Sequence, residues 1–283
     1  MSCQRSILAL ATGLAISPAA LHGQVTAFSN NPPPGDLFVN PGSSDQGQAV
    51  GASGWYYNNV RNSGEVGIRT DLPRAGNGSV WFHAPSGSAQ ADIEYLANAV
   101  NLSGNYFAAG SLAPFSSLTG MVYDWYRSSA STVPTYLHPV MRVLLDADGD
   151  LGTIGDRGGL VFEWAYNPAP PSSVPTDTWV TQPIMDTSVL WGFGAFPDGG
   201  YTTSLSAWKS AYPSAAILGF SLGVGSGWVG DFVGAVDNAM WVLGGSPIST
   251  NFEVVPEPTT WATFAGLGLL GFALWRRHGR SVS

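Results

Sequence analysis

The chain has 283 residues, of which 45% are hydrophobic and 11% are charged, and its formal net charge is −8 at pH 7. The terminal segments hold four of its eleven basic residues, so the body carries seven basic residues against nineteen acidic ones. This balance repels phosphate backbones and anionic lipid head groups. It argues against nucleic-acid binding and against a body that lies on a membrane.

Residues 1–23 have the layout of a secretory signal peptide, which would form a short apolar helix. Arg5 is followed by the apolar run ILALATGLAI and then by small residues. The chain's single cysteine, Cys3, lies in this segment, so the mature protein would contain none. We therefore expect export by the Sec pathway and a fold stabilised by a hydrophobic core rather than by disulfides.

Residues 24–54 are rich in proline and glycine, as in NNPPPGD and NPGSSDQGQ. These residues interrupt regular hydrogen-bonded ladders. We predict a flexible leading segment, loosely attached to the domain that follows.

Residues 55–250 contain short β-branched and aromatic runs separated by turn signals, which predicts eight or more strands. Apolar side chains alternate within these runs, and no strand–helix–strand rhythm occurs. We predict one all-β domain, a jelly-roll or concanavalin-like β-sandwich. Two runs in particular should each present one apolar face: Met121, Tyr123 and Trp125, and then Leu160, Phe162, Trp164 and Tyr166.

Aromatic residues of this domain are candidates for a sugar-binding surface, because a pyranose presents C–H groups that pack on an aromatic plane. Most aromatics of a sandwich are core residues, so each candidate also has a structural interpretation. The ligand-binding candidates are Trp55, Tyr57, Trp81, Trp125 and Trp228.

The stretch QADIE, residues 90–94, resembles the E-x-D-x-E strand of lectin-fold glycosidases, whose alternate carboxylates face one cleft. Here Gln90 takes the first position, and an amide cannot serve as the nucleophile of that reaction. We therefore assign no catalytic residue. Hydrolysis by Asp92 and Glu94 is an alternative that would need a second carboxylate across a groove, and solvent-facing strand charges are the structural interpretation.

The stretch DADGDLGTIGD begins like a calcium-binding loop, because Asp146, Asp148 and Asp150 follow the 1, 3, 5 spacing of such loops. Leu151 stands where the sharp turn needs glycine, and the twelfth position is Arg157 instead of glutamate. An irregular Ca²⁺ site that also uses Asp156 is one interpretation. An Asp/Gly-rich hairpin loop is the other, and we favour it.

One short helix is expected near residue 205. Leu205, Trp208 and Tyr212 fall on one helical face, Thr203 or Ser204 can cap the start, and Pro213 ends the segment. The surrounding stretch 204–245 resembles the closing segment of secreted concanavalin-like or carbohydrate-module-like sandwiches. In that comparison Asp237 and Asn238 would hydrogen-bond to backbone.

The chain ends with an uncharged apolar run, residues 259–275, at the short end of the roughly 17 to 25 residues that cross a bilayer. Arg276 and Arg277 follow at once, which by the positive-inside rule holds that end in the cytoplasm. A simple transmembrane tail anchor is the plainest interpretation.

Residues 254–280 also resemble the PEP-CTERM sorting signal, because a Pro-Glu-Pro motif, a Gly-rich apolar helix and a basic end occur in order. The resemblance implies a temporary stop in the inner membrane of a Gram-negative bacterium and processing by an exosortase. Delivery to the cell surface or the exopolysaccharide matrix would follow. The residues that carry it are Val255, Pro256, Glu257, Pro258, Arg276 and Arg277.

Together these patterns predict a non-enzymatic exported protein of the cell surface or the extracellular matrix, whose β-sandwich binds polysaccharide. A polysaccharide hydrolase of lectin-like fold and a purely structural matrix protein are the alternatives. No cofactor is expected apart from the Ca²⁺ of the irregular site.

Overall fold

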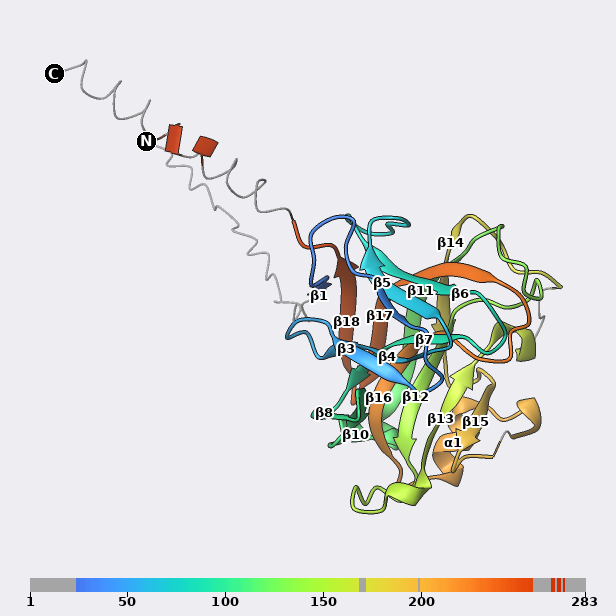
Figure 1. The fold of residues 1–283 in the computed structure, drawn as a ribbon. Coiled ribbons are helices and arrows are strands. Elements are labelled where there is room, and N and C mark those ends of the chain that lie inside the picture. The colour runs from blue at the N-terminus through green and yellow to red at the C-terminus, as the bar shows by residue number, and fades with distance from the viewer. Residues whose placement is uncertain are drawn as a thin grey trace, which may run out of the picture.

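The computed structural model describes residues 24–167, 172–197 and 199–256, together with residues 266, 267, 269, 270 and 272. Two eight-stranded sheets pack face to face around a common core (Figure 1). The predicted all-β sandwich is confirmed. The signal peptide predicted for residues 1–23 lies outside the described residues.

The first sheet runs in the order β1-β18-β17-β6-β5-β2, with β11 along the other edge of β17 and β14 beside β11. Strand β17 is long, so β18 and β6 share one of its edges while β11 covers the other. The strands of this sheet are β1 (Val25–Phe28), β2 (Phe38–Asn40), β5 (Gly64–Arg69), β6 (Ser79–Ala84), β11 (Leu118–Arg127), β14 (Trp179–Ile184), β17 (Phe232–Leu243) and β18 (Ser246–Glu253).

The second sheet runs in the order β15-β13-β12-β16-β7-β4-β3, with the short β10 beside β16. A separate hairpin, β8 and β9, lies next to it. The strands are β3 (Gln46–Ala49), β4 (Trp55–Arg61), β7 (Gln90–Leu96), β8 (Ala99–Leu102), β9 (Asn105–Ala108), β10 (Ala113–Pro114), β12 (Val140–Asp146), β13 (Arg157–Phe162), β15 (Leu190–Gly194) and β16 (Ala216–Val224).

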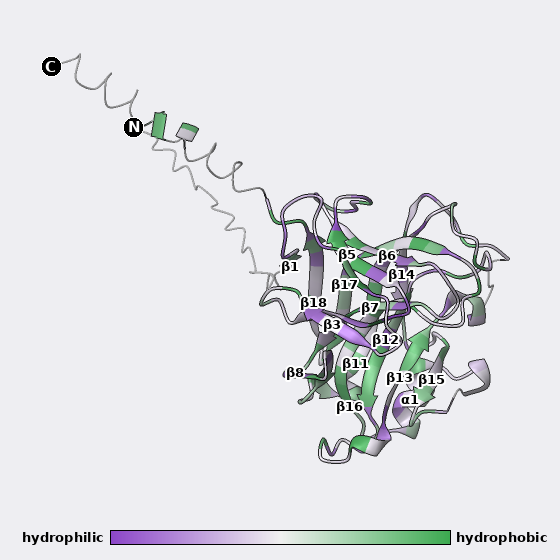
Figure 2. Ribbon diagram, viewed as in Figure 1, coloured by the Kyte–Doolittle hydropathy of each residue, from purple (hydrophilic) through white to green (hydrophobic). Residues whose placement is uncertain are grey.

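Aromatic rings join the two sheets. Phe220 of β16 stacks on Trp241 of β17 with ring centroids 4.2 Å apart, and Trp55 of β4 meets Phe252 of β18 at 4.9 Å. All four side chains are buried, and apolar residues concentrate in the strands (Figure 2). Truncating a ring of this size to alanine in a core costs about 3 to 5 kcal/mol of unfolding free energy.

The predicted strand faces are confirmed in part. Met121, Tyr123 and Trp125 are all buried in the core. Strand β13, however, ends at Phe162, and residues 164–166 form a 3₁₀ turn. The physical reason lies in the partner strand, because β12 begins at Val140 directly after Pro139, which has no N–H to extend the ladder.

Residues 24–54, which we expected to be loosely attached, contribute β1, β2 and β3 to the two sheets. The buried carboxylate of Asp36 ties this segment down. It accepts hydrogen bonds from the backbone N–H groups of Asn30 (2.8 Å) and Asn31 (2.9 Å) and from the hydroxyl of Tyr57 (2.7 Å). The prolines and glycines mark turns between strands, and the segment is part of the sandwich.

The predicted helix is α1 (Leu205–Ala211), and its N-cap is Ser204, whose hydroxyl accepts a hydrogen bond from the Ala207 N–H at 3.2 Å. Its apolar side packs Leu205 and Trp208 into the core. Single 3₁₀ turns connect other elements, namely η1 (Phe115–Ser117), η2 (Ile154–Asp156), η3 (Trp164–Tyr166) and η4 (Gly199–Tyr201).

The described body continues to the end of β18 and three residues beyond it. Val254 is buried, and the side chain of Asn77 bonds both its N–H and its carbonyl, at 2.9 and 3.0 Å. Glu257, Pro258, Arg276, Arg277 and most of the apolar run 259–275 lie outside the described residues. Within the described residues we find no helix with the length and apolarity needed to cross a membrane.

Candidate functional site

A cavity of about 490 Å³ lies on the face of the second sheet that is turned away from the core; we call it the groove. Part of the hollow lies over the central strand β16, where Gly219, Ser221 and Gly223 have short side chains, while Phe220 and Leu222 alternate into the core. Leu218 of the same strand also lines the cavity. A Cβ atom at Gly223 would lie 2.2 Å from the carboxylate of Asp92. Larger side chains on this strand would fill the groove.

One row of residues crosses the groove from strand to strand. Glu94 of β7 lies opposite Ser221 of β16, which lies opposite Arg142 of β12. The row continues through Val161 of β13 to Trp191 of β15, the edge strand. Directly paired residues point to the same face of a sheet. Four strand spacings, about 19 Å, therefore separate a carboxylate end of the groove from an aromatic end.

An ion pair lies in the middle of the groove. The Arg142 Nη1 atom donates to Asp92 at 2.7 Å and to the Ser221 hydroxyl at 3.2 Å. Gln90 donates to the second oxygen of Asp92 at 2.9 Å. Asp92 is buried and Arg142 nearly so, which strengthens the pair and makes the loss of either partner costly.

An irregularity in β4 aims two amides at the carboxylates. The register against β7 shifts between Asn58 and Arg61, and Asn59 has a positive φ of 52°. Asn58 and Asn59, although consecutive, therefore both direct their side chains to the groove. Asn58 donates to Glu94 at 2.7 Å and Asn59 donates to it at 2.9 Å.

Glu94 is the most perturbed acid of the groove. Burial raises its pKa to about 7, and the neighbouring Asp92 carboxylate raises it too. The hydrogen bond from Asn58 and the charge of Arg142 partly offset these effects. Glu94 therefore exchanges its proton near neutral pH.

The hairpin of β8 and β9 forms a wall of the groove through Tyr106, Phe107 and Ala108. The amide of Asn58 binds both backbone groups of Tyr106, at 2.9 Å each, and the Asn59 and Asn105 side chains bond to each other at 3.1 Å. Asn58 and Asn59 thus bind both the groove carboxylates and the hairpin that forms the wall.

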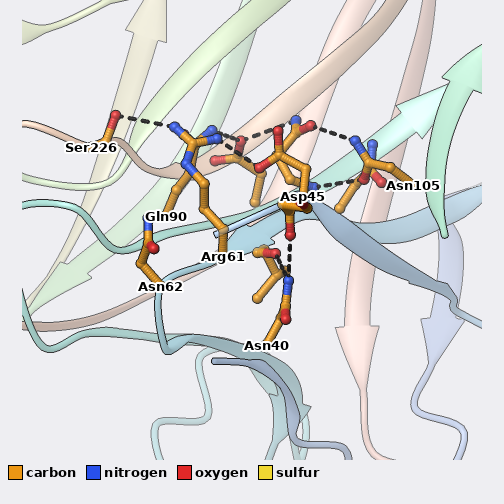
Figure 3. Close-up of polar contacts among 12 residues, drawn as sticks. Asn40, Asp45, Arg61, Asn62, Gln90, Asn105 and Ser226 are labelled. Carbon is orange, nitrogen blue, oxygen red and sulfur yellow. Dashed lines mark hydrogen bonds and ion pairs between the residues drawn. The ribbon is translucent and has the colours of Figure 1, made fainter. Parts of the chain in front are cut away.

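Arg61 of β4 pairs with Gln90 of β7, and Figure 3 shows its polar contacts. Its guanidinium donates to Asp45 at 2.6 Å and to the Ser226 hydroxyl at 3.3 Å. Ser226 and Gln90 both line the groove. Arg61 therefore attaches the loop after β16 to the end of β4 and to Asp45.

The structure does not bring the five predicted ligand-binding aromatics together at the groove. Trp55, Tyr57, Trp125 and Trp228 are buried, with at most 8% of their surface exposed. Trp81 is half-buried on the outer face of the other sheet, beside His83. Trp55, Tyr57 and Trp125 lie on strand faces that pack against the opposite sheet, and Trp228 is buried beside Phe232, so these four are core residues and the prediction is wrong for them. For Trp81 it stays a prediction.

The aromatics that line the groove are Trp191, Phe193, Tyr106 and Phe107, and we did not single them out from the sequence. A signal was present in SVLWGFGAF, because Trp191 and Phe193 are two residues apart and therefore share a face of β15. The glycine between them, Gly192, faces the core side. Arg142 carried no such signal, since a single arginine within an apolar run has no pattern around it.

The polar residues of the QADIE stretch face one cleft, as their resemblance to a glycosidase strand predicted. Gln90, Asp92 and Glu94 all line the groove. Two further acids of the body do not line the groove. Glu65 pairs with His83 on the first sheet. Glu163 follows β13; burial raises its pKa, and the nearby Arg142 charge and Trp191 partly offset this. Asp92 and Glu94 are the carboxylates among the residues that line the groove.

The acidic loop between β12 and β13 brings together three of its four predicted calcium ligands. Oxygen atoms of Asp146, Asp148 and Asp156 lie within 4.8 Å of one another. Asp150 turns away and accepts a hydrogen bond from the Gly152 N–H at 3.0 Å. Arg157 lies 3.5 Å from Asp146 and supplies part of the neutralising charge. The Ca²⁺ site stays a prediction, now restricted to three carboxylates.

Asp237 hydrogen-bonds to backbone as predicted, whereas the side chain of Asn238 bonds to other side chains, those of Asp124 and Gln24. Asp237 accepts hydrogen bonds from the backbone N–H groups of Asn238 (2.8 Å), Phe252 (3.0 Å) and Ala75 (3.2 Å). Burial raises its pKa to about 7. The Asn238 amide donates to Asp124 at 2.8 Å.

Comparison with known proteins identifies one motif by sequence. Residues 254–277 match the PEP-CTERM protein-sorting motif, which confirms the resemblance seen at the end of the chain. No curated protein matches the chain as a whole. The motif is that of secreted proteins that an exosortase processes.

Two solved structures similar to this chain are Family 11 carbohydrate-binding modules from Clostridium thermocellum. One is in complex with a β-1,3-1,4-mixed-linked tetrasaccharide; identity is 12%, the TM-score is 0.38, and the alignment covers 71% of this chain and 95% of the other. The second belongs to the cellulosomal cellulase Lic26A-Cel5E. Its identity is 12% and its TM-score 0.33, with 78% of this chain and 96% of the other covered.

Proposed function

We propose that this protein is exported to the cell surface or the exopolysaccharide matrix, where its groove binds polysaccharide. The observation that carries the proposal is the row from Glu94 through Arg142 to Trp191. It combines hydroxyl-binding groups with a half-buried tryptophan at the edge strand in one elongated hollow. Sugar sites need this combination, because each ring offers hydroxyls at its rim and C–H groups on its faces.

The charges of the groove favour a neutral glycan. Arg142 is already paired with Asp92, so a uronate that took over the guanidinium would leave a buried carboxylate without its partner. Glu94 adds negative charge nearby, and the body as a whole is acidic. Neutral hydroxyls can donate to both carboxylates and accept from the amides without this penalty.

Binding is favoured over hydrolysis by the residues that flank the ion pair. Gln90 occupies the place where a nucleophile would be needed, and Asp92 is engaged by Arg142. Glu94, with its raised pKa, could still donate a proton, so hydrolysis is tested directly. Reducing ends should not accumulate when the protein is incubated with a polysaccharide that it retains; their accumulation would favour the hydrolase.

Affinity electrophoresis in gels that contain neutral or acidic polysaccharides tests the binding proposal. Retardation by at least one neutral polymer is expected, and Trp191→Ala should weaken it about tenfold, because one stacking ring and its burial are lost. Trp81→Ala is the matched control, since Trp81 is a half-buried tryptophan on the other sheet. Unchanged mobility in every polymer would instead support the purely structural matrix protein.

The sorting proposal concerns the route to the outside. We propose that residues 259–275 hold the precursor in the inner membrane of a Gram-negative bacterium until an exosortase acts near Pro256–Pro258. The intact mass of the extracellular protein tests this. Loss of the C-terminal segment is expected, and retention of residues 261–280 would indicate a permanent anchor.

A further inference from the structure

The aromatic surface does not end at the edge of the groove. Trp191 lies on β15, the edge strand of the second sheet, and lines the groove. Its ring centroid is 6.1 Å from that of Tyr201 in η4, and Tyr201 stacks on Tyr166 of η3 at 4.3 Å with an interplanar angle of 26°. The three rings form a continuous path that leaves the groove and passes over the edge of the sheet.

The outer two rings of this path remain open to solvent. Tyr166 is 39% exposed and Tyr201 is 40% exposed, whereas the core tyrosines Tyr57 and Tyr123 are fully buried. Burial of apolar surface drives a core ring into place, and that driving force is largely absent here. Two stacked, exposed tyrosines next to an elongated groove are therefore an available binding surface.

The backbone at Tyr201 is the second observation. Its φ is +57°, and it follows Gly199 (+69°) and Gly200 (+60°), so three successive residues adopt the left-handed conformation. Glycine adopts it freely, but a residue with a bulky side chain rarely does. The turn is held by Thr202 and Thr203, which hydrogen-bond to the Gly199 carbonyl at 3.3 and 3.1 Å. A strained aromatic residue kept at the surface points to a function for its ring.

We propose that Tyr201 and Tyr166 form an outer subsite, which stacks on a sugar unit of a glycan chain after that chain has crossed the groove and passed Trp191. This inference rests on the proposed polysaccharide binding. The groove supplies hydrogen bonds through Arg142, Asn59 and the two carboxylates, and the outer subsite supplies stacking alone. Because the two parts lie in line, the protein prefers long chains to short fragments of the same sugar.

Neutral sugars suit this subsite for a physical reason. No charged side chain is needed to bind a pyranose face, and the phenol hydroxyls can donate to ring hydroxyls at the edge of the stack. A short oligosaccharide fills the groove and gains nothing from the tyrosines. A longer one gains the outer contact, which lowers its dissociation rate.

The test is calorimetric titration of the full-length secreted protein with an oligosaccharide ladder, from two to eight units, prepared from a polymer that the groove retains. Wild-type affinity should keep rising beyond the length that spans the groove. Tyr201→Gly should reduce affinity for the longest oligosaccharides about five- to tenfold and leave the shortest unchanged. This substitution fits the left-handed backbone, so the variant should unfold at the wild-type temperature or above it.

Three further variants complete the design. Tyr201→Phe should retain most of the long-chain affinity, because the ring persists, and Tyr166→Ala should lose it, as Tyr201→Gly does. Phe28→Ala is the control, since Phe28 is 46% exposed on β1 of the other sheet. If Tyr201→Gly bound long chains as tightly as the wild type does, the outer subsite would be overturned. An equal loss of affinity for short and long chains would also overturn it. If no polymer is retained by the wild type, polysaccharide binding itself fails.

Discussion

Two pairs of buried carboxylates lie on the two sheets of this sandwich, and one member of the second pair, Asp237, differs from the groove pair in the kind of its partners. Asp124 is bound by side chains, as the groove pair is. Asp92 and Glu94 face the groove and accept hydrogen bonds from side chains, those of Asn58, Asn59, Gln90 and Arg142. On the first sheet Asp237, which pairs with Asp124 across β11 and β17, accepts from three backbone N–H groups.

This difference separates carboxylates suited to binding a ligand, Asp92 and Glu94, from a structural carboxylate, Asp237. Side-chain amides and a guanidinium can rotate to meet a ligand or water, whereas backbone donors are fixed by the strands that carry them. The groove pair also lines a cavity of about 490 Å³, although its carboxylates are as buried as those of the other pair. The other pair is closed by Arg74, which donates to Asp124 at 3.1 Å, and by Thr181. Buried carboxylates therefore serve ligand binding on the second sheet and hold strands together on the first.

The largest effect on stability should come from removing the Asp237 carboxylate. Asp237→Ala leaves the N–H groups of Asn238, Phe252 and Ala75 without their acceptor inside the protein. Each unsatisfied buried donor costs about 1 to 3 kcal/mol, so the unfolding free energy should fall by about 3 to 5 kcal/mol. Urea denaturation measures it. An unchanged midpoint would show that water satisfies the three backbone N–H groups. Asp237 would then have no structural role to contrast with the groove carboxylates.

Stability should also depend on pH through both pairs. Burial raises the pKa of Glu94 and of Asp237 to about 7, so the folded state holds protons that the unfolded chain releases near pH 4. The contribution of these two groups to stability is therefore fully present below about pH 4 and is lost as pH rises through 7; Glu94 accounts for about 3 kcal/mol of the loss.

Urea denaturation of Glu94→Gln and Asp237→Asn between pH 4 and 8 separates the two contributions. Each variant should remove part of the pH dependence. Only Glu94→Gln should also alter how polysaccharide binding varies with pH, because only Glu94 lines the groove. Identical effects of the two variants on binding would contradict the assignment.

A further loss of stability is expected from Asp92→Ala, about 3 kcal/mol, because the buried Arg142 guanidinium loses its ion-pair partner. Retention by polysaccharide gels should also disappear, because the central ion pair is gone. Thermal unfolding and affinity electrophoresis report the two quantities separately. Unchanged retention of Asp92→Ala by the gels would contradict the assignment of Asp92 to a binding site.

The smallest effect concerns the acidic loop after β12, where carboxylates gather without enough donors. If Asp146, Asp148 and Asp156 bind Ca²⁺, millimolar calcium should add about 1 kcal/mol and raise the melting temperature by about 2 to 4 °C. Asp148→Asn should abolish the shift, and Asp150→Asn should not, because Asp150 is outside the cluster. The same melting temperature with calcium and with EDTA would leave the hairpin-loop interpretation.

Local patterns in the sequence determined several features. The alternation of Met121, Tyr123 and Trp125 indicated a buried strand face, the Ser204 cap and Pro213 bounded α1, and the ordered elements of the chain end identified the sorting motif. Each depends on residues within one turn or one strand of each other. Such short-range relations are visible in a linear chain.

Only the tertiary structure decided which faces are inside and which residues meet. Trp55 and Trp191 lie in similar strand patterns, but β4 turns Trp55 toward the other sheet and β15 turns Trp191 into the groove. Arg142 and Asp92 are 50 residues apart and become partners through the order of β12, β16 and β7. Strand order and register arise from the packing of the whole core, and no local pattern encodes them.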